Sequence, residues 1–103
     1  MASRRMMITA AQIRAARGLL DWKRHQLSKA SGVPHSTIAD YERGRTSSML
    51  TENAGKLITA FATEGVEFVD ASAQHGSGVH WKDEQSEREA AIKSASRVKT
   101  ARG

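Results

Sequence analysis

The stretch from Gln26 to Arg45, QLSKASGVPHSTIADYERGR, constrains the fold of this 103-residue chain more than any other segment. Apolar residues at helical spacing precede a tight turn, Leu27 with Ala30, and others follow it, Ile38 with Tyr41. Residues that break or end helices stand at the turn and at the close of the stretch, namely Gly32, Pro34 and Gly44. The segment therefore predicts two short helices joined by a corner. The second helix is expected at about residues 34–43, since proline suits a first helical position.

A glycine-containing turn between two short helices is typical of the helix-turn-helix motif. The second helix of that motif is shaped to enter the major groove of DNA, where its outward residues reach the base edges. We expect His35, Ser36 and Asp40 to read bases, because Ser and His can donate or accept hydrogen bonds and ionised Asp accepts them. The same spacing places Ala39 and Arg43 on this outward face.

Two cations, Lys23 and Arg24, stand at the start of the motif's first helix. Cations at a helix N-terminus oppose the helix dipole, at a cost of about 0.3–1 kcal/mol each. Phosphate binding is a reason to tolerate that cost, since the free amides and the cations then point at one anion. Arg43, Arg45 and Thr37 complete the expected phosphate contacts. Two tolerated surface cations remain the alternative explanation at the first helix.

The positive charge is concentrated in the half of the chain that holds this motif. Residues 1–45 carry nine Lys or Arg against three Asp or Glu, whereas residues 46–82 carry two against four. The remainder, from residue 83 onward, carries five bases and four acids. This distribution is expected of a phosphate-facing surface, although ordinary solubilising charge would also produce it.

Helices are predicted on both sides of the motif. After a flexible arm at residues 1–8, Thr9 and Gln12 match a capping box that opens a helix. Its inward face would comprise Ile13, Ala16 and Leu20. Trp22 follows and is expected to fill the core between helices. A second amphipathic helix is predicted over residues 51–64, with an apolar stripe at Ala54, Leu57, Ile58, Phe61 and Ala62.

The pattern changes to that of strands after Gly65. Residues 66–70 and 79–82 are predicted to pair as a hairpin around the turn cluster at 74–78. An isolated two-stranded hairpin is marginal in water, so it must pack on the helices or pair with a second copy. The dimer-interface candidates are Val66, Phe68, Val79 and Trp81. Residues 83–103 form a charged tail, expected to be a frayed helix or disordered.

Composition argues against an enzyme. A chain of this length has little capacity for a deep catalytic pocket, and none of its four histidines has a convincing partner. His75 and His80 flank the hairpin loop, but two ligands without any cysteine do not make a metal site, and surface histidines explain them better. We therefore expect no cofactor and no metal. The lack of cysteine fits a cytoplasmic protein, and no apolar run approaches membrane-spanning length.

Residues 8–45 resemble the XRE-type family of lambda-repressor-like and Cro-like helix-turn-helix regulators, and the likeness extends over about residues 8–66. The most diagnostic pieces are L-x-x-x-x-G-V-x-x-x-T-I, from Leu27 to Ile38, and Y-E-R-G, from Tyr41 to Gly44. The resemblance implies a mainly α, lambda-repressor-like bundle of four to five helices at residues 9–65. The hairpin at 66–82 and the tail at 83–103 would be appended to it, as in a subgroup of small bacterial regulators.

The resemblance also implies roles for individual residues. It implies a structural ion pair between Arg17 and Glu42, and it places His35, Ser36 and Asp40 at base-reading positions. It sets Arg24 where the family usually has a phosphate-contacting glutamine, and Lys23 where it usually has a small polar cap. Both replacements should preserve phosphate affinity, although the geometry at this helix start departs from the family pattern.

Two binding roles stay open. In the first, a homodimer represses transcription, including that of its own gene, by reading two DNA half-sites about one helical turn apart. In the second, the same scaffold acts through protein partners, as an antitoxin or antiactivator. The cations at Lys23, Arg24, Arg43 and Arg45 favour DNA. An exposed apolar surface on residues 51–64 or on the hairpin would favour a protein partner.

Overall fold

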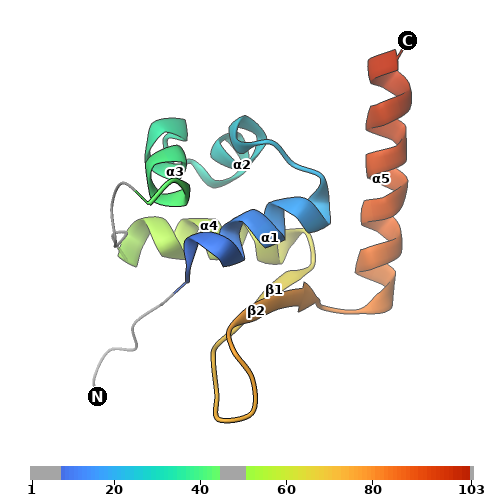
Figure 1. Ribbon diagram of the computed structural model, residues 1–103. Helices are drawn as coiled ribbons and strands as arrows, with labels where there is room; N and C mark the ends of the chain where they lie inside the picture. Colours follow the sequence, from blue (N-terminus) through green and yellow to red (C-terminus); the bar gives the residue numbers. More distant parts are fainter. Residues whose placement is uncertain (1–7, 45–50, 103) are drawn as a thin grey trace.

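The computed structural model describes residues 8–44 and 51–102, with side chains for residues 8–44 and 51–96 (Figure 1). The elements in chain order are α1 (Ala10–Leu20), α2 (Arg24–Ser31), α3 (His35–Glu42), α4 (Thr51–Thr63), β1 (Val66–Val69), β2 (Gly78–Trp81) and α5 (Glu84–Arg102). The described chain is thus mainly helical with one small hairpin, which confirms the expected lambda-repressor-like class.

The elements are stacked in three levels. Helices α1 and α4 lie in the middle, α2 and α3 cover one side of them, the hairpin lies on the other side, and α5 stands alongside (Figure 1). Helix α1 contacts α3 and β2, while α4 contacts α2 and β1. The largest fully buried side chains fill the space between these elements; they are Phe61, Ile13, Leu27, Ile38, Leu57, Val33 and Val66. A single core therefore connects the two-helix corner to the hairpin.

Helix α1 begins at the expected capping box. The Thr9 hydroxyl accepts a hydrogen bond from the Gln12 amide at 3.0 Å, and Gln12 Oε1 accepts from the Thr9 amide at 2.9 Å. The helix ends at Asp21, which adopts a left-handed conformation with φ of 58°. Trp22 then turns into the molecule, where its ring stacks on Phe61 with centroids 5.9 Å apart. The expected role of Trp22 between the helices is confirmed.

The hairpin is held by the same glutamine that caps α1. The strands are antiparallel, with Val66 opposite Trp81 and Phe68 opposite Val79, so these four side chains share one face. Gln12 Nε2 donates to the carbonyl oxygens of Val69, at 3.1 Å, and Gly78, at 2.9 Å. The long-range half of this arrangement was not predicted, because nothing in the local sequence marks it.

Residues 84–102 form one helix, α5. Asp83 caps it: its Oδ1 accepts from the Ser86 amide at 2.8 Å, and that bond lowers the pKa of the Asp83 carboxyl. Gly65, at φ of +87°, lies so close to Ser86 that a Cβ there would collide with the serine side chain. The beginning of α5 is therefore fitted tightly against the end of α4.

Two polar contacts fix the course of α5 further along. Lys93 Nζ lies 3.3 Å from Glu64 Oε1, next to the end of α4. Ser94 Oγ donates to Asp21 Oδ2 at 2.8 Å, at the end of α1. The helix therefore runs from the hairpin past the ends of α4 and α1.

Four expectations are corrected or left outside the described residues. Ala39, expected to face outward, is 4% exposed and packs inward. Pro34 is the cap before α3 rather than its first residue. Ile8, assigned to the flexible arm, is buried in the core and its carbonyl accepts a hydrogen bond from the Tyr41 hydroxyl at 2.7 Å. Residues 1–7 and Arg45 lie outside the described ranges.

Candidate nucleic-acid interface

The corner between α2 and α3 is locked by short hydrogen bonds. Gly32 adopts φ of +83°, a conformation that favours glycine, and its amide donates to the Ser28 carbonyl at 2.8 Å. The Ser28 hydroxyl donates to the Val33 carbonyl at 2.6 Å, and the Val33 amide donates to Ser31 Oγ at 3.1 Å. Val33 itself is fully buried. The start of α3 is therefore held in one orientation relative to α2.

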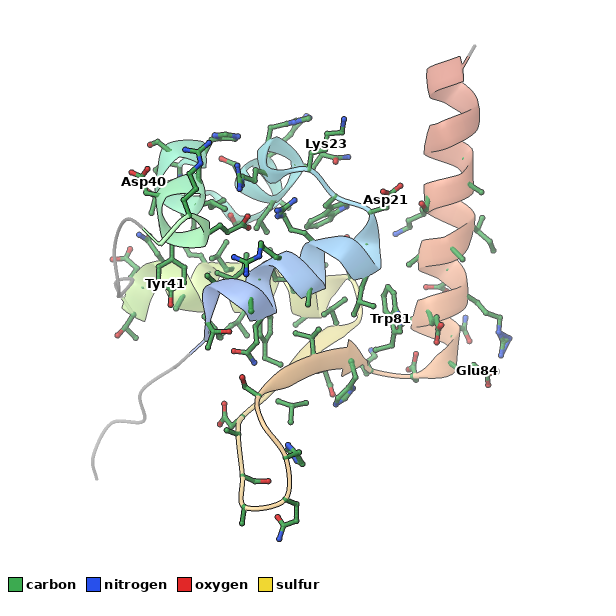
Figure 2. The ribbon with its side chains drawn as sticks, in the orientation of Figure 1. Asp21, Lys23, Asp40, Tyr41, Trp81 and Glu84 are labelled. Carbon is green, nitrogen blue, oxygen red and sulfur yellow. The ribbon has the colours of Figure 1, made fainter. Side chains whose placement is uncertain are left out.

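Helix α3 presents a polar outer face. His35 and Ser36 in its first turn are exposed, Asp40 one turn further is half-buried, and Figure 2 shows Asp40 on the outer flank of the helix. Thr37 is half-buried, and Arg43 is exposed just after the helix ends. The three residues predicted to read bases thus share the outer side of one short helix, on which Ile38 and Ala39 form the buried side.

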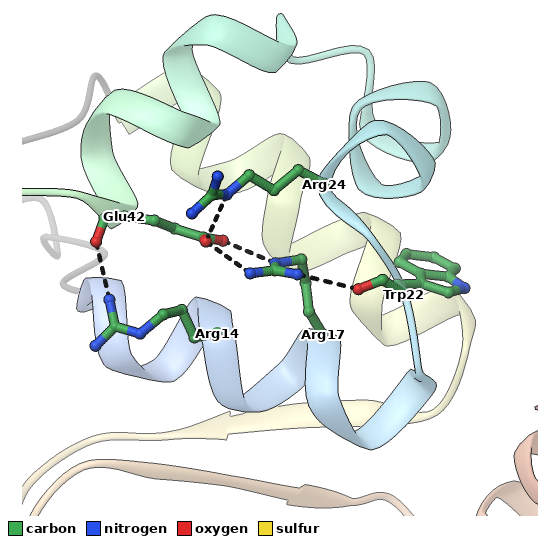
Figure 3. A network of polar contacts seen from close by, with 5 residues as sticks. All are labelled: Arg14, Arg17, Trp22, Arg24 and Glu42. Carbon is green, nitrogen blue, oxygen red and sulfur yellow. Dashed lines mark hydrogen bonds and ion pairs between the residues drawn. The ribbon is translucent and has the colours of Figure 1, made fainter.

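Three helices meet at the carboxylate of Glu42, the last residue of α3 (Figure 3). Arg17 of α1 donates through Nε to Oε2 at 2.9 Å and through Nη2 to Oε1 at 2.7 Å. Arg24 of α2 donates through Nε to Oε1 at 2.9 Å. A further arginine of α1, Arg14, donates to the Glu42 backbone carbonyl at 2.9 Å. The implied Arg17–Glu42 ion pair is therefore present, and Arg24 joins it.

The charge of Glu42 is stabilised although its side chain is 0% exposed. Burial by itself raises the pKa of this carboxyl, but the hydrogen bonds and positive charges of Arg17 and Arg24 outweigh burial and lower the pKa. Glu42 is therefore ionised at neutral pH. It links the position of α3 to the guanidinium group at the start of α2.

A shallow basic hollow lies beside this network. It has a volume of about 420 Å³ and is lined by Arg17, Lys23, Arg24, His25 and His35. These residues come from the end of α1, the start of α2 and the first turn of α3. The hollow therefore lies beside the N-termini of α2 and α3 and is lined by the cations Arg17, Lys23 and Arg24, and both features favour an anion.

The predicted phosphate contacts are placed differently around this hollow. Lys23 is exposed and caps α2, where its amide donates to Gln26 Oε1 at 2.7 Å. The Arg24 side chain is 28% exposed and already shares Glu42 with Arg17. Arg43 lies beyond the far end of α3, outside the lining of the hollow. Lys23, Arg24 and His35 thus line the same hollow. His25 lines it too, although no role for His25 was predicted from the sequence.

The candidate dimer residues of the hairpin lie against the chain's own core. Val66 is 1% exposed, which leaves almost no side-chain surface for a partner. Phe68, Val79 and Trp81 are half-buried and pack on the same core, with Phe68 and Phe61 ring centroids 5.6 Å apart. The apolar face of the hairpin therefore packs mainly on the core of the same chain.

The remaining histidines do not gather into a metal site. Within the part of the chain that the structure describes, no three His, Asp or Glu side chains come together as ligands would. His80 Nε2 lies 3.9 Å from Glu67 Oε1, across the hairpin. The same part of the chain contains no helix that is both long and apolar enough to cross a membrane.

Comparison with known proteins agrees with this geometry. A family model described as helix-turn-helix matches residues 13–68, which is more than half of the chain. The matched range begins inside α1, takes in α2, α3 and α4, and ends within β1. The search of curated proteins finds no match.

Proposed function

The chain belongs to the XRE-type helix-turn-helix family of DNA-binding regulators, and from this premise we propose that it is a sequence-specific transcriptional repressor that controls its own gene. It would act in the bacterial cytoplasm on double-stranded DNA. The proposal assigns base reading to His35, Ser36 and Asp40, and phosphate binding to Lys23, Arg24, Thr37, Arg43 and Arg45.

The basic hollow carries this proposal. Its cations, Lys23 and Arg24, adjoin the first turn of α3, where His35 and Ser36 are exposed. A backbone phosphate bound in the hollow would therefore set the register of α3 in the major groove. Arg24 uses Nε for Glu42, and a guanidinium has four further N–H donors with which to bind the phosphate.

Salt titration of DNA binding tests the proposal. The duplex would be the region upstream of the gene, and binding would be followed by fluorescence anisotropy. Lys23→Ala should weaken binding to every duplex alike and reduce the log–log salt slope by about 0.9, since one phosphate contact is lost. Lys23 is the right target because, among the residues that the structure describes, no hydrogen bond is found for its side chain, whereas Arg24→Ala would also disturb Glu42.

A separate measurement tests the assignment of base-reading residues. Ser36→Ala should change which sequence is preferred, by about 1–3 kcal/mol at the base pair concerned. Lys82→Ala is the matched control for Lys23→Ala, because it also removes one exposed cation but lies in the link between β2 and α5. Equal affinity for the upstream region and for random DNA, or binding insensitive to salt, would refute the proposed function.

We propose that the active form is a homodimer whose copies read two half-sites about one helical turn apart. Phe68, Val79 and Trp81 keep part of their surface exposed on the hairpin, and they are the candidates for its interface. Light scattering should give twice the monomer mass of 11.2 kDa. Trp81→Ser should shift the protein toward that monomer mass, and an unchanged dimer would remove Trp81 from the interface.

The surface favours DNA over a role as antitoxin or antiactivator. Among the side chains that the structure describes, the exposed large hydrophobic residue is Ile92, at 69%. It lies on α5, not on α4 or the hairpin, where an apolar patch was expected if the chain worked through a protein partner.

A further inference from the structure

Charge is segregated along α5. All four acids of residues 83–103 lie in its first part, at Asp83, Glu84, Glu87 and Glu89. Residues 90–103 contain no acid and four bases, at Lys93, Arg97, Lys99 and Arg102. Lys93 pairs with Glu64, and the other three cations lie beyond Ser94, whose hydroxyl donates to Asp21.

The contacts of α5 define the direction in which its basic end points. The helix starts beside Gly65 and β2 on the hairpin side, and reaches Asp21 at the end of α1 by residue 94. Asp21 is two residues before Lys23, which lines the basic hollow. The helix then continues to Arg102, and these eight residues span about 12 Å at 1.5 Å each.

The figures agree with this direction. The C-terminal half of α5 rises past α2, away from the hairpin, and Lys23 lies on the side of the molecule toward which it points (Figure 2). The basic segment is therefore continuous in direction with the surface proposed to face DNA, and lies at its flank.

We propose that residues 95–102 of α5 are a second DNA-binding element, which contacts the sugar-phosphate backbone beside the base pairs read by α3. The inference rests on the proposed function. Charge complementarity indicates DNA as the partner, since a helix end with three cations and no acid attracts a polyanion. Because phosphates carry no sequence information, this element adds affinity and leaves the sequence preference to α3.

The helix dipole accounts for only part of the segregation. Acids in the first turn and bases in the last turn stabilise any helix, and that effect falls off within one turn. Arg97 stands more than one turn before the end of α5, and Glu89 lies beyond its first turn. One base, Arg88, stands among the acids, so it is the run of bases without acids after residue 89 that the dipole leaves unexplained.

Neutralising the basic end tests this inference on the full chain. The variant is R97Q/K99Q/R102Q, since glutamine is a good helix former and only the charge is lost. The control, K56Q/K82Q/R88Q, removes the same charge from α4, the β2–α5 link and the first half of α5. Both variants and the unchanged protein would be titrated with the upstream duplex at several salt concentrations.

The basic-end variant should bind at least 10-fold more weakly at about 0.1 M salt, and its log–log slope should be shallower by about 0.9 for each phosphate contact that is lost. Its ratio of specific to random-DNA affinity should stay constant, and hydroxyl-radical footprints should lose protection beside the site. A slope and affinity equal to those of the control would overturn the inference while leaving the proposed function intact. Failure of the unchanged protein to bind any duplex would refute both.

Discussion

Replacing Glu42 with alanine removes the carboxylate at which α1, α2 and α3 meet. Three hydrogen bonds from guanidinium groups are lost, and each such bond to a charged group contributes about 1.5–3 kcal/mol. The full value does not apply, because the Arg17 and Arg24 side chains are 19% and 28% exposed and water can rehydrate them. We expect a loss of about 3 kcal/mol, at the lower end of the 3–5 kcal/mol typical for a buried pair that loses one partner.

Urea denaturation followed by circular dichroism measures this loss. With a slope of about 1.5 kcal/mol per molar urea for a small protein, the midpoint of Glu42→Ala should fall by about 2 M. Glu52→Ala is the control, since Glu52 lies 3.7 Å from Lys56 and both side chains are exposed. That pair contributes less than about 0.5 kcal/mol. Equal midpoints for the two variants would refute the assignment of Glu42 as the link between the helices.

Three further predictions concern the charge of Glu42, the hydrogen bonds of Gln12 and the surroundings of two glycines. Because the pKa of Glu42 is lowered in the folded state, its contribution to the free energy of unfolding is complete above the ordinary glutamate pKa of about 4.3 and is lost as pH falls through the folded value. The urea midpoint of Glu42→Gln should therefore fall less steeply with acid than that of the unchanged protein. Parallel profiles of midpoint against pH would contradict this. Gln12→Leu leaves the Val69 and Gly78 carbonyls without their donor and should lower the free energy of unfolding by about 1–3 kcal/mol. Amide hydrogen exchange should accelerate most in the hairpin, and exchange that rises evenly over the whole chain would argue against a local anchor. Gly65→Ala should destabilise the fold by about 1–3 kcal/mol because of its positive φ and the collision with Ser86, whereas Gly18→Ala, where a Cβ has open space, should stabilise α1 by up to about 1 kcal/mol. In thermal melts, a raised midpoint for Gly65→Ala would contradict the first expectation, and a lowered midpoint for Gly18→Ala would contradict the second.

The helices could be predicted because their signals are local. The expected ranges 34–43 and 51–64 lie within one residue of the observed bounds of α3 and α4, and the Thr9–Gln12 capping box was visible as two residue types at fixed spacing. The Arg17–Glu42 pair required the family resemblance, since nothing local joins two residues that are 25 positions apart.

What could not be predicted depends on contacts between distant segments. Ala39 was assigned outward from its spacing, but alanine fits either side of a helix and its burial is decided by the neighbours that α3 meets. Arg24 was read only as a phosphate ligand, since its approach to Glu42 depends on how α2 crosses α3. The ordered course of α5 likewise depends on Gly65, Glu64 and Asp21, which no pattern within residues 83–103 could reveal.

Gln12 has a consequence for how the chain acquires its structure. Its amide group satisfies the start of α1 and, across 57 and 66 positions of sequence, both strands of the hairpin. The bonds to the strands can form only when these distant segments have met, and such non-local contacts slow folding because the intervening loop must close first. A fragment cut before β1 would therefore lose both strand acceptors of this amide and leave the amide to be hydrated by water.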